Sequence, residues 1–127
     1  MNSAVAAYRQ NTIDTAAPGQ LVVMLYRGVL NSLGLIEAAL GGGAKDIDLA
    51  HKELLRAQDI IMELLQTLDF SVQPIADHLA GLYQFCLTGL IESNVTKTFA
   101  PAEPVRKIFD QLADAWEQIA LGEHAGA

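Results

Sequence analysis

The chain has 127 residues, of which 51% are hydrophobic and 18% are charged. This length allows one domain with a buried core, and the hydrophobic content excludes an intrinsically disordered protein. The formal net charge is -7, and the eight Lys and Arg residues form no basic block. Nucleic acids and anionic membrane surfaces both bind basic patches, so neither is expected as the main partner.

The sequence also indicates a compartment. Cys86 is the only cysteine, so no internal disulfide can form, and a reducing compartment is expected. The opening residues lack the basic-then-apolar pattern of a signal peptide. No apolar run approaches the ~20 residues that a membrane span needs. The sequence therefore predicts a cytoplasmic protein without membrane insertion.

Residues 1–14 are mostly small and polar, with isolated apolar side chains, and are expected to form an N-terminal arm. Their composition favours neither a helix nor a mobile segment. Thr15 and Pro18 then mark a helix start, because the first turn of a helix leaves an N–H unbonded that proline lacks. This helix is expected to reach about Leu40, where a run of glycines ends it. The side chains expected on its core face are Val22, Leu25, Val29, Leu33, Ile36 and Leu40.

The second helix has the most regular pattern in the sequence. Between Lys45 and Asp69 the apolar residues recur in alternating steps of three and four, which is typical of a helix packed against other helices. Carboxylates at Asp46 and Asp48 suit the start of this helix, because they oppose its dipole favourably. The residues of this seam are Ile47, Ala50, Leu54, Ala57, Ile61, Leu64 and Leu68. A second row runs beside the seam and consists of His51, Leu55, Gln58, Met62 and Leu65.

A third helix is expected from about Val72 to Lys97. Prolines then interrupt the helical pattern, and a fourth helix follows to about Leu121, before a tail at residues 122–127. Their expected core faces carry Ile75, Leu79, Leu82, Cys86 and Leu90 on the third helix and Val105, Phe109, Leu112, Trp116 and Ile119 on the fourth. No segment alternates with the period of a strand. Residues 15–121 are therefore predicted to form an all-α, antiparallel four-helix bundle.

No group of residues in the sequence predicts catalysis, a metal site or a cofactor. His51, His78 and His124 each lack a second ligand-type residue at a suitable spacing, and the Glu-x-x-His pairs of di-iron bundles are absent. Cys86 lies on an apolar seam, where a structural thiol is favoured over a nucleophile. The glycine triplet does not follow a strand and lacks the Gly-Lys-Ser/Thr ending of a phosphate loop. We therefore expect a protein that is not an enzyme.

Two alternative functions come from other classes of protein. Histidine phosphotransfer domains are helical bundles of this size with an exposed acceptor histidine, and His51 is the candidate here. In that family a lysine stands three residues after the histidine and a glycine follows it. Here the lysine is Lys52 and the glycine is missing. The second alternative is a structural homodimer of helical bundles, which concentration-dependent stability would identify.

The helices carry more apolar surface than a four-helix bundle needs, since about three core positions in seven are enough. Leu55, Met62 and Leu65 form this surplus on the second helix, and methionine suits a surface that adapts to a partner. Two interpretations stay open. The row packs against the N-terminal arm or a neighbouring helix, or it forms an open groove for an apolar helical segment.

A family resemblance begins at Tyr8, with the sequence YRQNTIDTAAPGQLVVMLYRGVLNSL. This stretch closely resembles the opening of the FliS family, the flagellin-specific export chaperones. Four later segments agree in order, ELLRAQDIIMELLQTLD, HLAGLYQF, IESN and LADAWEQI, so the resemblance extends to about Ile119. Three positions depart from the family pattern. Ala17 replaces the usual serine, Arg27 stands where an acidic residue is common, and Ser93 replaces an alanine.

The resemblance implies a cytosolic export chaperone. Such proteins bind the disordered C-terminal segment of flagellin in a hydrophobic groove, prevent its premature polymerisation and help to deliver it to the flagellar export apparatus. The bound segment becomes helical, so the burial of apolar surface must exceed the cost of ordering the client. In this family the N-terminal arm, with the tyrosine matched by Tyr8, can cover the groove when no client is present.

Several residues are candidates for contact with the client, or with the groove in the case of the arm. Tyr8 and Ile13 have no helical seam to join, so a groove-covering role is expected for both. On the bundle, apolar side chains would supply affinity, while Gln58 and Asn94 would fix the register by bonding to the client backbone. The full set of candidate partner-binding residues is Tyr8, Ile13, Leu55, Gln58, Met62, Leu65, Tyr83, Leu87 and Asn94.

Overall fold

A computed structural model describes residues 18–126 of the chain, with side chains placed for residues 19–122. The described part forms four long α-helices and a single 3-10 turn, with no strand. The elements are α2 (Pro18–Gly41), α3 (Ile47–Gln66), α4 (Ile75–Thr96), η1 (Ala100–Ala102) and α5 (Glu103–Gly126). The prediction of an all-α fold with four packed helices is confirmed. The predicted N-terminal arm lies outside the described residues.

Local hydrogen bonds explain where the helices begin and end. The Asp46 carboxylate accepts a hydrogen bond from the backbone N–H of Leu49 at 3.1 Å, which caps the start of α3. At the end of α4, Lys97 adopts a left-handed conformation with φ 55, and its N–H donates to the carbonyl of Ser93 at 2.8 Å. That geometry terminates a helix. Helix α5 continues to Gly126, so most of the predicted tail is helical.

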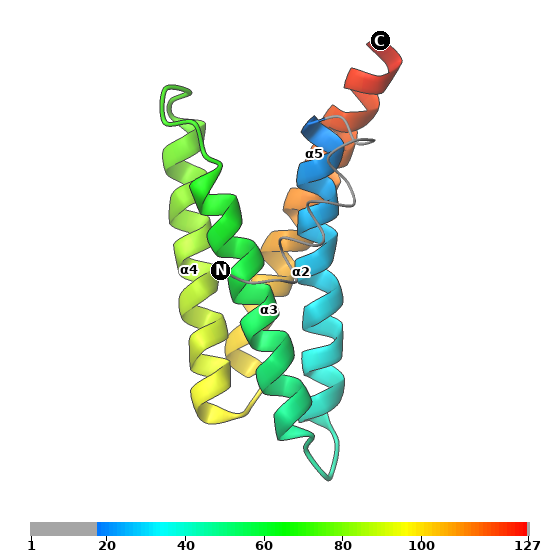
Figure 1. Cartoon of the computed structure of the whole chain (residues 1–127), viewed down its shortest axis with the longest axis vertical. Coiled ribbons are helices and arrows are strands. Elements are labelled where there is room, and N and C mark those ends of the chain that lie inside the picture. The colour runs from blue at the N-terminus through cyan, green and yellow to red at the C-terminus, as the bar shows by residue number, and fades with distance from the viewer. Residues whose placement is uncertain (1–17, 127) are drawn as a thin grey trace.

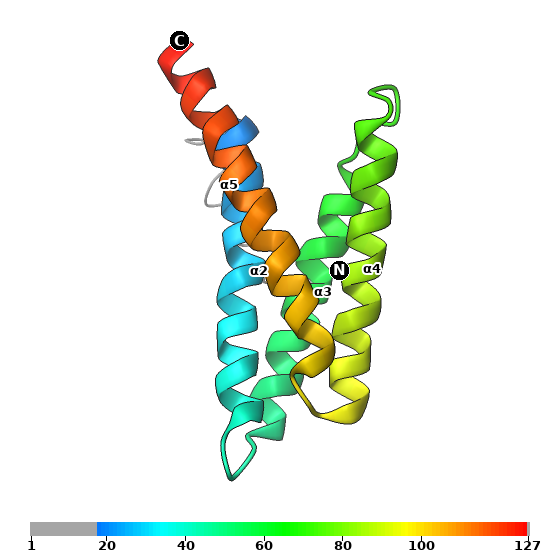
Figure 2. The ribbon, with the colours of Figure 1, turned by 180° about the vertical axis from the view of Figure 1, so that it is seen from behind.

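The four helices run alternately up and down, as an antiparallel bundle does (Figure 1). Helix α2 packs closely on α3 and α5, whereas α4 packs mainly on α3 and on η1. The pair α2/α5 and the pair α3/α4 lie close together at the end that holds η1 and diverge toward the other end (Figures 1 and 2). We call these the closed end and the open end of the bundle.

An aromatic cluster joins the helices inside the bundle. Tyr26 of α2 contacts Phe109 and Trp116 of α5 edge-on, with ring centroids 5.5 and 5.8 Å apart. Its hydroxyl lies 2.7 Å from the hydroxyl of Tyr83 on α4. Burial raises the pKa of both tyrosine hydroxyls, and it raises the pKa of the Cys86 thiol to about 12. All three groups therefore stay protonated and uncharged, as buried core groups.

Four residues of the predicted core faces are exposed, and the divergence of the helix pairs accounts for two of them. Ile75, Leu82 and Ile119 were expected to be buried, but they are 47%, 37% and 50% exposed. Ile75 is the first residue of α4 and Ile119 lies in the last two turns of α5, and these two helix ends are at the open end, where the pairs diverge (Figure 2). Ile47, in the first turn of α3, is also exposed. The remaining residues of the α3 seam from Ala50 to Leu64 are buried as predicted.

One expectation about apolar length is wrong. Residues Gly19–Gly41 are long and apolar enough to cross a membrane when only length and composition are considered. In the bundle, however, Val29, Leu33 and Ile36 of this helix are fully buried in the core. A core helix of a helical bundle meets the same two criteria of length and composition, and α2 is such a core helix.

Candidate functional site

The second row of α3 lies at the surface of the bundle. Leu55 and Met62 are 42% and 49% exposed, and Gln58 and Leu65 are half-buried. The seam beside them turns into the core, so the row is carried on the flank of α3 that adjoins α4. The sequence separated these two rows correctly. Among the described residues, no helix packs over the second row.

Helix α4 supplies the opposite wall. Leu87, Ile91 and Asn94 follow one another at steps of four and three along α4, so they share one face of that helix. Leu87 and Asn94 are half-buried, and Ile91 is exposed. Helices α3 and α4 are antiparallel neighbours. The α3/α4 groove is defined here as the surface between Leu55, Gln58, Met62 and Leu65 on α3 and Leu87, Ile91 and Asn94 on α4.

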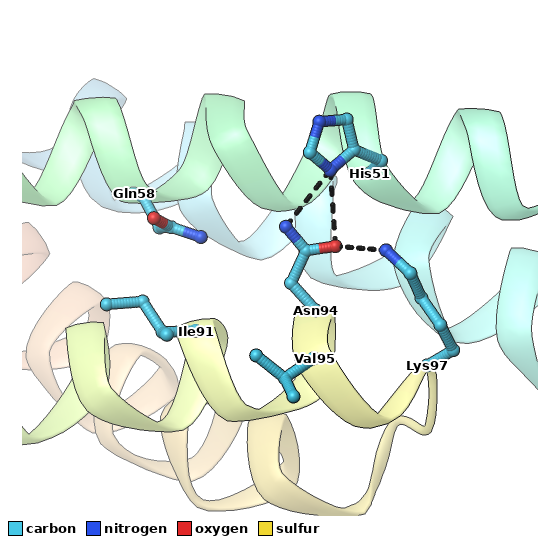
Figure 3. Close-up of a pocket in the computed structure, with 6 residues that line it drawn as sticks. All are labelled: His51, Gln58, Ile91, Asn94, Val95 and Lys97. Carbon is cyan, nitrogen blue, oxygen red and sulfur yellow. Dashed lines mark hydrogen bonds between the residues drawn. The ribbon is translucent and has the colours of Figure 1, made fainter.

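The closed end of this groove contains a small polar pocket. Figure 3 shows His51 and Gln58 on α3 facing Asn94 on α4, with Lys97 beside them. The Nδ2 atom of Asn94 lies 3.0 Å from Nδ1 of His51, and the Lys97 ammonium donates to the Asn94 side-chain oxygen. The pocket has a volume of about 240 Å³, and Ile91 also lines it. A hydrogen-bonded side-chain cluster therefore ends an otherwise mostly apolar groove.

Among the described residues, one predicted contact residue is not part of this surface. Tyr83 is only 2% exposed, and its hydroxyl is bonded to Tyr26 inside the bundle. It is therefore a core residue in this structure, and we do not carry it forward as a client contact. Tyr8 and Ile13 lie outside the described residues, so their groove-covering role stays a prediction.

A second apolar pocket lies at the open end and was missed by sequence reasoning. It has a volume of about 180 Å³. Its lining joins the seams of different helices, with Val22 from α2, Leu64 from α3, Leu79 from α4 and Trp116 from α5. The sequence assigned such residues to a closed core. The exposed apolar turn residue Val72, which also lines the pocket, was the available signal.

The described residues hold no group of three or more His, Cys, Asp or Glu side chains placed to bind a metal ion. Glu53 is the most buried carboxylate among them, and it accepts a hydrogen bond from Ser32 at 3.0 Å. Arg56 lies 3.5 Å from the same carboxylate. The cluster joins α2 to α3, and the Arg56 guanidinium balances the charge of the Glu53 carboxylate. We therefore interpret it as a structural contact.

Comparison with known proteins gives one consistent result. The family model described as "Flagellar protein FliS" matches residues 1–123. A flagellar secretion chaperone FliS of Bacillus subtilis (strain 168) is 30% identical over 117 residues, which cover 92% of this chain and 86% of the relative. The protein of the same name from Salmonella typhimurium is 29% identical over 123 residues, covering 92% of this chain and 90% of the relative. The one from Vibrio cholerae is 28% identical over 124 residues, covering 94% and 90%.

Proposed function

The chain belongs to the FliS family of flagellar proteins, and on that basis we propose that it is a cytoplasmic export chaperone that binds the C-terminal segment of flagellin in the α3/α4 groove. Members of this family are chaperones and not enzymes. The phosphotransfer alternative for His51 is therefore not carried forward.

The observation that carries this proposal is the exposed apolar row on α3. Leu55 and Met62 are each more than two-fifths exposed, although they occupy helix positions beside a fully packed seam. Ile91 of α4 is 51% exposed across the groove. An amphipathic helix can bury such side chains by laying its own apolar face between α3 and α4. Methionine adapts its shape to the partner at little cost.

The polar members of the groove would fix how the client lies. Gln58 and Asn94 present side-chain amides on opposite walls. Each amide offers both a donor and an acceptor, so it can bond to client groups that apolar walls leave unsatisfied. A few such groups in an apolar site give orientation and specificity, and the apolar contacts give affinity.

Binding of this kind would serve both protection and release. A disordered segment that folds into the groove is withheld from assembly with other flagellin molecules, which prevents premature polymerisation. Part of the interaction free energy is used to order the client. The net affinity is therefore modest for the area buried, and the export apparatus can receive the client in an unfolded form.

The N-terminal arm is proposed to compete with the client. Tyr8 and Ile13 are the apolar side chains that would occupy the groove when it is empty. A competitor tethered to the same chain reduces the apparent affinity for the client to the intrinsic affinity multiplied by the fraction of molecules whose groove is uncovered. The arm would thus keep the apolar walls out of contact with other proteins until flagellin arrives.

The experiment that tests the proposal places a charge in the groove wall. Met62→Glu is compared with Ile119→Glu, because Met62 and Ile119 are 49% and 50% exposed and lie on different helices. Binding of a C-terminal flagellin peptide from the same organism is measured by calorimetry, and helix content by circular dichroism. We expect Met62→Glu to weaken binding at least about 30-fold, which corresponds to roughly 2 kcal/mol for an anchor residue.

Ile119→Glu is the matched control and should bind as tightly as the unaltered chain. Both variants should keep their helix content, since both sites are half-exposed. Equal binding by all three proteins would place the client elsewhere on the bundle. Loss of helix content in Met62→Glu would mean that Met62 is needed for the core.

A further inference from the structure

The lysines of the described region differ from its arginines in one respect. Each of the three described arginines, Arg27, Arg56 and Arg106, forms an ion pair with a carboxylate. Lys45 and Lys97 form no such pair with any residue of the range 18–126; Lys45 instead donates to the backbone carbonyl of Lys97 at 2.7 Å. Two ammonium groups without an anionic partner thus lie at the closed end of the α3/α4 groove.

The hydrogen bonds at this end leave donors in excess. Asn94 uses its side-chain oxygen to accept from Lys97, and its amide nitrogen is the atom nearer to Nδ1 of His51, at 3.0 Å against 3.3 Å for the oxygen. With the Asn94 amide donating to Nδ1, the second ring nitrogen of His51 is left as an N–H donor. The Lys97 ammonium has three N–H groups, and one of them is used within the cluster. The site is built to receive an acceptor that carries negative charge.

Acidic residues lie at the opposite end of the groove. Asp77 lies in the first turn of α4, and Asp69 follows the end of α3. Hydrogen bonds from Ser71 lower the pKa of Asp69, so its carboxylate stays ionised. The groove therefore has acidic residues near its open end, whereas its closed end holds the ammonium groups of Lys45 and Lys97 beside Asp46 and Asp48 at the start of α3. A helix has the complementary polarity, because its N-terminus is partly positive and its C-terminus partly negative.

We propose that the cluster of His51, Asn94 and Lys97 binds the C-terminal α-carboxylate of the client. This inference rests on the function proposed above. A helix that ends at this cluster also brings its last, unbonded backbone carbonyls to the same donors. The client helix must then run antiparallel to α3 and parallel to α4. The cluster would therefore select both the orientation of the client helix and a client with a free C-terminal carboxylate.

The test compares two synthetic peptides with the natural C-terminal sequence of flagellin from the same organism. One ends in a free carboxylate and the other in a carboxamide. Their dissociation constants are measured by calorimetry with the full chain, with Lys97→Asn and with Lys107→Gln. Asparagine tolerates the left-handed conformation of position 97, and Lys107 is an exposed lysine on α5 that serves as the control for loss of charge.

For the unaltered chain and for Lys107→Gln, the free-acid peptide should bind about fivefold more tightly than the amide, as expected for one charge at a helix terminus. In Lys97→Asn this ratio should fall to about one. An acid-to-amide ratio of one in the unaltered chain would overturn the inference. So would an equal loss of affinity for both peptides in Lys97→Asn, which would assign Lys97 to an acidic side chain of the client. Absence of binding by both peptides to every protein would instead contradict the proposed function.

Discussion

At the scale of single residues, Tyr83 illustrates what a helical pattern can and cannot predict. Its position beside the α4 seam suggested a contact with the client. The structure buries it, because its hydroxyl meets the hydroxyl of Tyr26 and its ring stacks on Phe109 with centroids 6.2 Å apart. Periodicity gives the face of a helix on which a residue lies. It does not give the partner that a side chain meets on another helix.

The tyrosine pair leads to a prediction about stability. Tyr83→Phe leaves the Tyr26 hydroxyl buried without its partner, and Tyr26→Phe does the same to Tyr83. Each single change should lower the free energy of unfolding by about 1–3 kcal/mol. The double change removes both polar groups and should recover most of that loss. Urea unfolding followed by circular dichroism measures all four proteins.

The same variants separate core from client surface. Tyr83→Phe should leave the dissociation constant for the flagellin peptide unchanged, because the hydroxyl does not face the α3/α4 groove. Weaker binding by a Tyr83→Phe protein that is as stable as the unaltered chain would return Tyr83 to the client surface. Additive losses in the double variant would contradict the hydrogen-bonded pairing.

Arg27 is a second case at the residue scale. It stands where an acidic residue is common in the family, next to the buried Tyr26. Its guanidinium bonds to Glu117 of α5 and lies 4.0 Å from Asp114. These groups are well exposed, so the ion pair contributes little to stability. The departure is thus accommodated by carboxylates on the neighbouring helix.

At the scale of whole helices, α3 was the most predictable element. Its seam and its second row were both assigned from the sequence, and the structure places the seam from Ala50 to Leu64 in the core and the second row at the surface. Whether the second row was covered could not be predicted, because that depends on how α4 lies beside α3. The register that places His51 beside Asn94 likewise depends on two helices together. It cannot be predicted from the sequence of either helix alone.

The approach of α4 to η1 leads to a prediction that uses two glycines of one helix. A β-carbon added at Gly89 would lie 2.7 Å from the backbone carbonyl oxygen of Pro101 and 3.3 Å from Val105. Gly89→Ala must therefore push η1 and the start of α5 away from α4, and we expect the free energy of unfolding to fall by about 1–3 kcal/mol. Thermal and urea unfolding measure the change.

Gly81→Ala is the matched control, because nothing lies within 4 Å of a β-carbon at that position. Alanine favours a helix over glycine by up to about 1 kcal/mol, so this variant should be as stable as the unaltered chain or more stable. A loss of stability at both positions would indicate that α4 needs glycine for a reason other than the contact with Pro101.

At the scale of the whole molecule, the sequence predicted four antiparallel helices but not their divergence. Each helix carries a continuous seam, and continuous seams suggest a bundle that is closed along its length. The exposed residues Ile75 and Ile119 show that the seams are not fully paired. Their pairing depends on the angle between α4 and α5, which the period of either seam does not encode.

The function of the N-terminal arm is tested on the intact bundle. Deletion of residues 1–14 should tighten binding of the flagellin peptide, because it removes the proposed competitor for the groove. If the arm covers the groove in about nine molecules of ten, the apparent affinity should rise about tenfold. Calorimetry measures the change, and circular dichroism checks that the bundle is intact. Weaker binding after deletion would mean that the arm contributes contacts to the client.

Helix α4 touches η1 closely at Gly89, so a tilt of α4 about this contact would move the distant end of the helix most. Gly89 lies near the closed end, and Ile75 lies about 21 Å away along the axis of the same helix. A tilt of about 5° around Gly89 moves Ile75 by about 2 Å, while the backbone at Pro101 hardly moves. A small rotation at Gly89 thus produces a larger displacement at the N-terminal end of α4. A tilt of α4 about Gly89 would therefore change the width of the open end far more than that of the closed end.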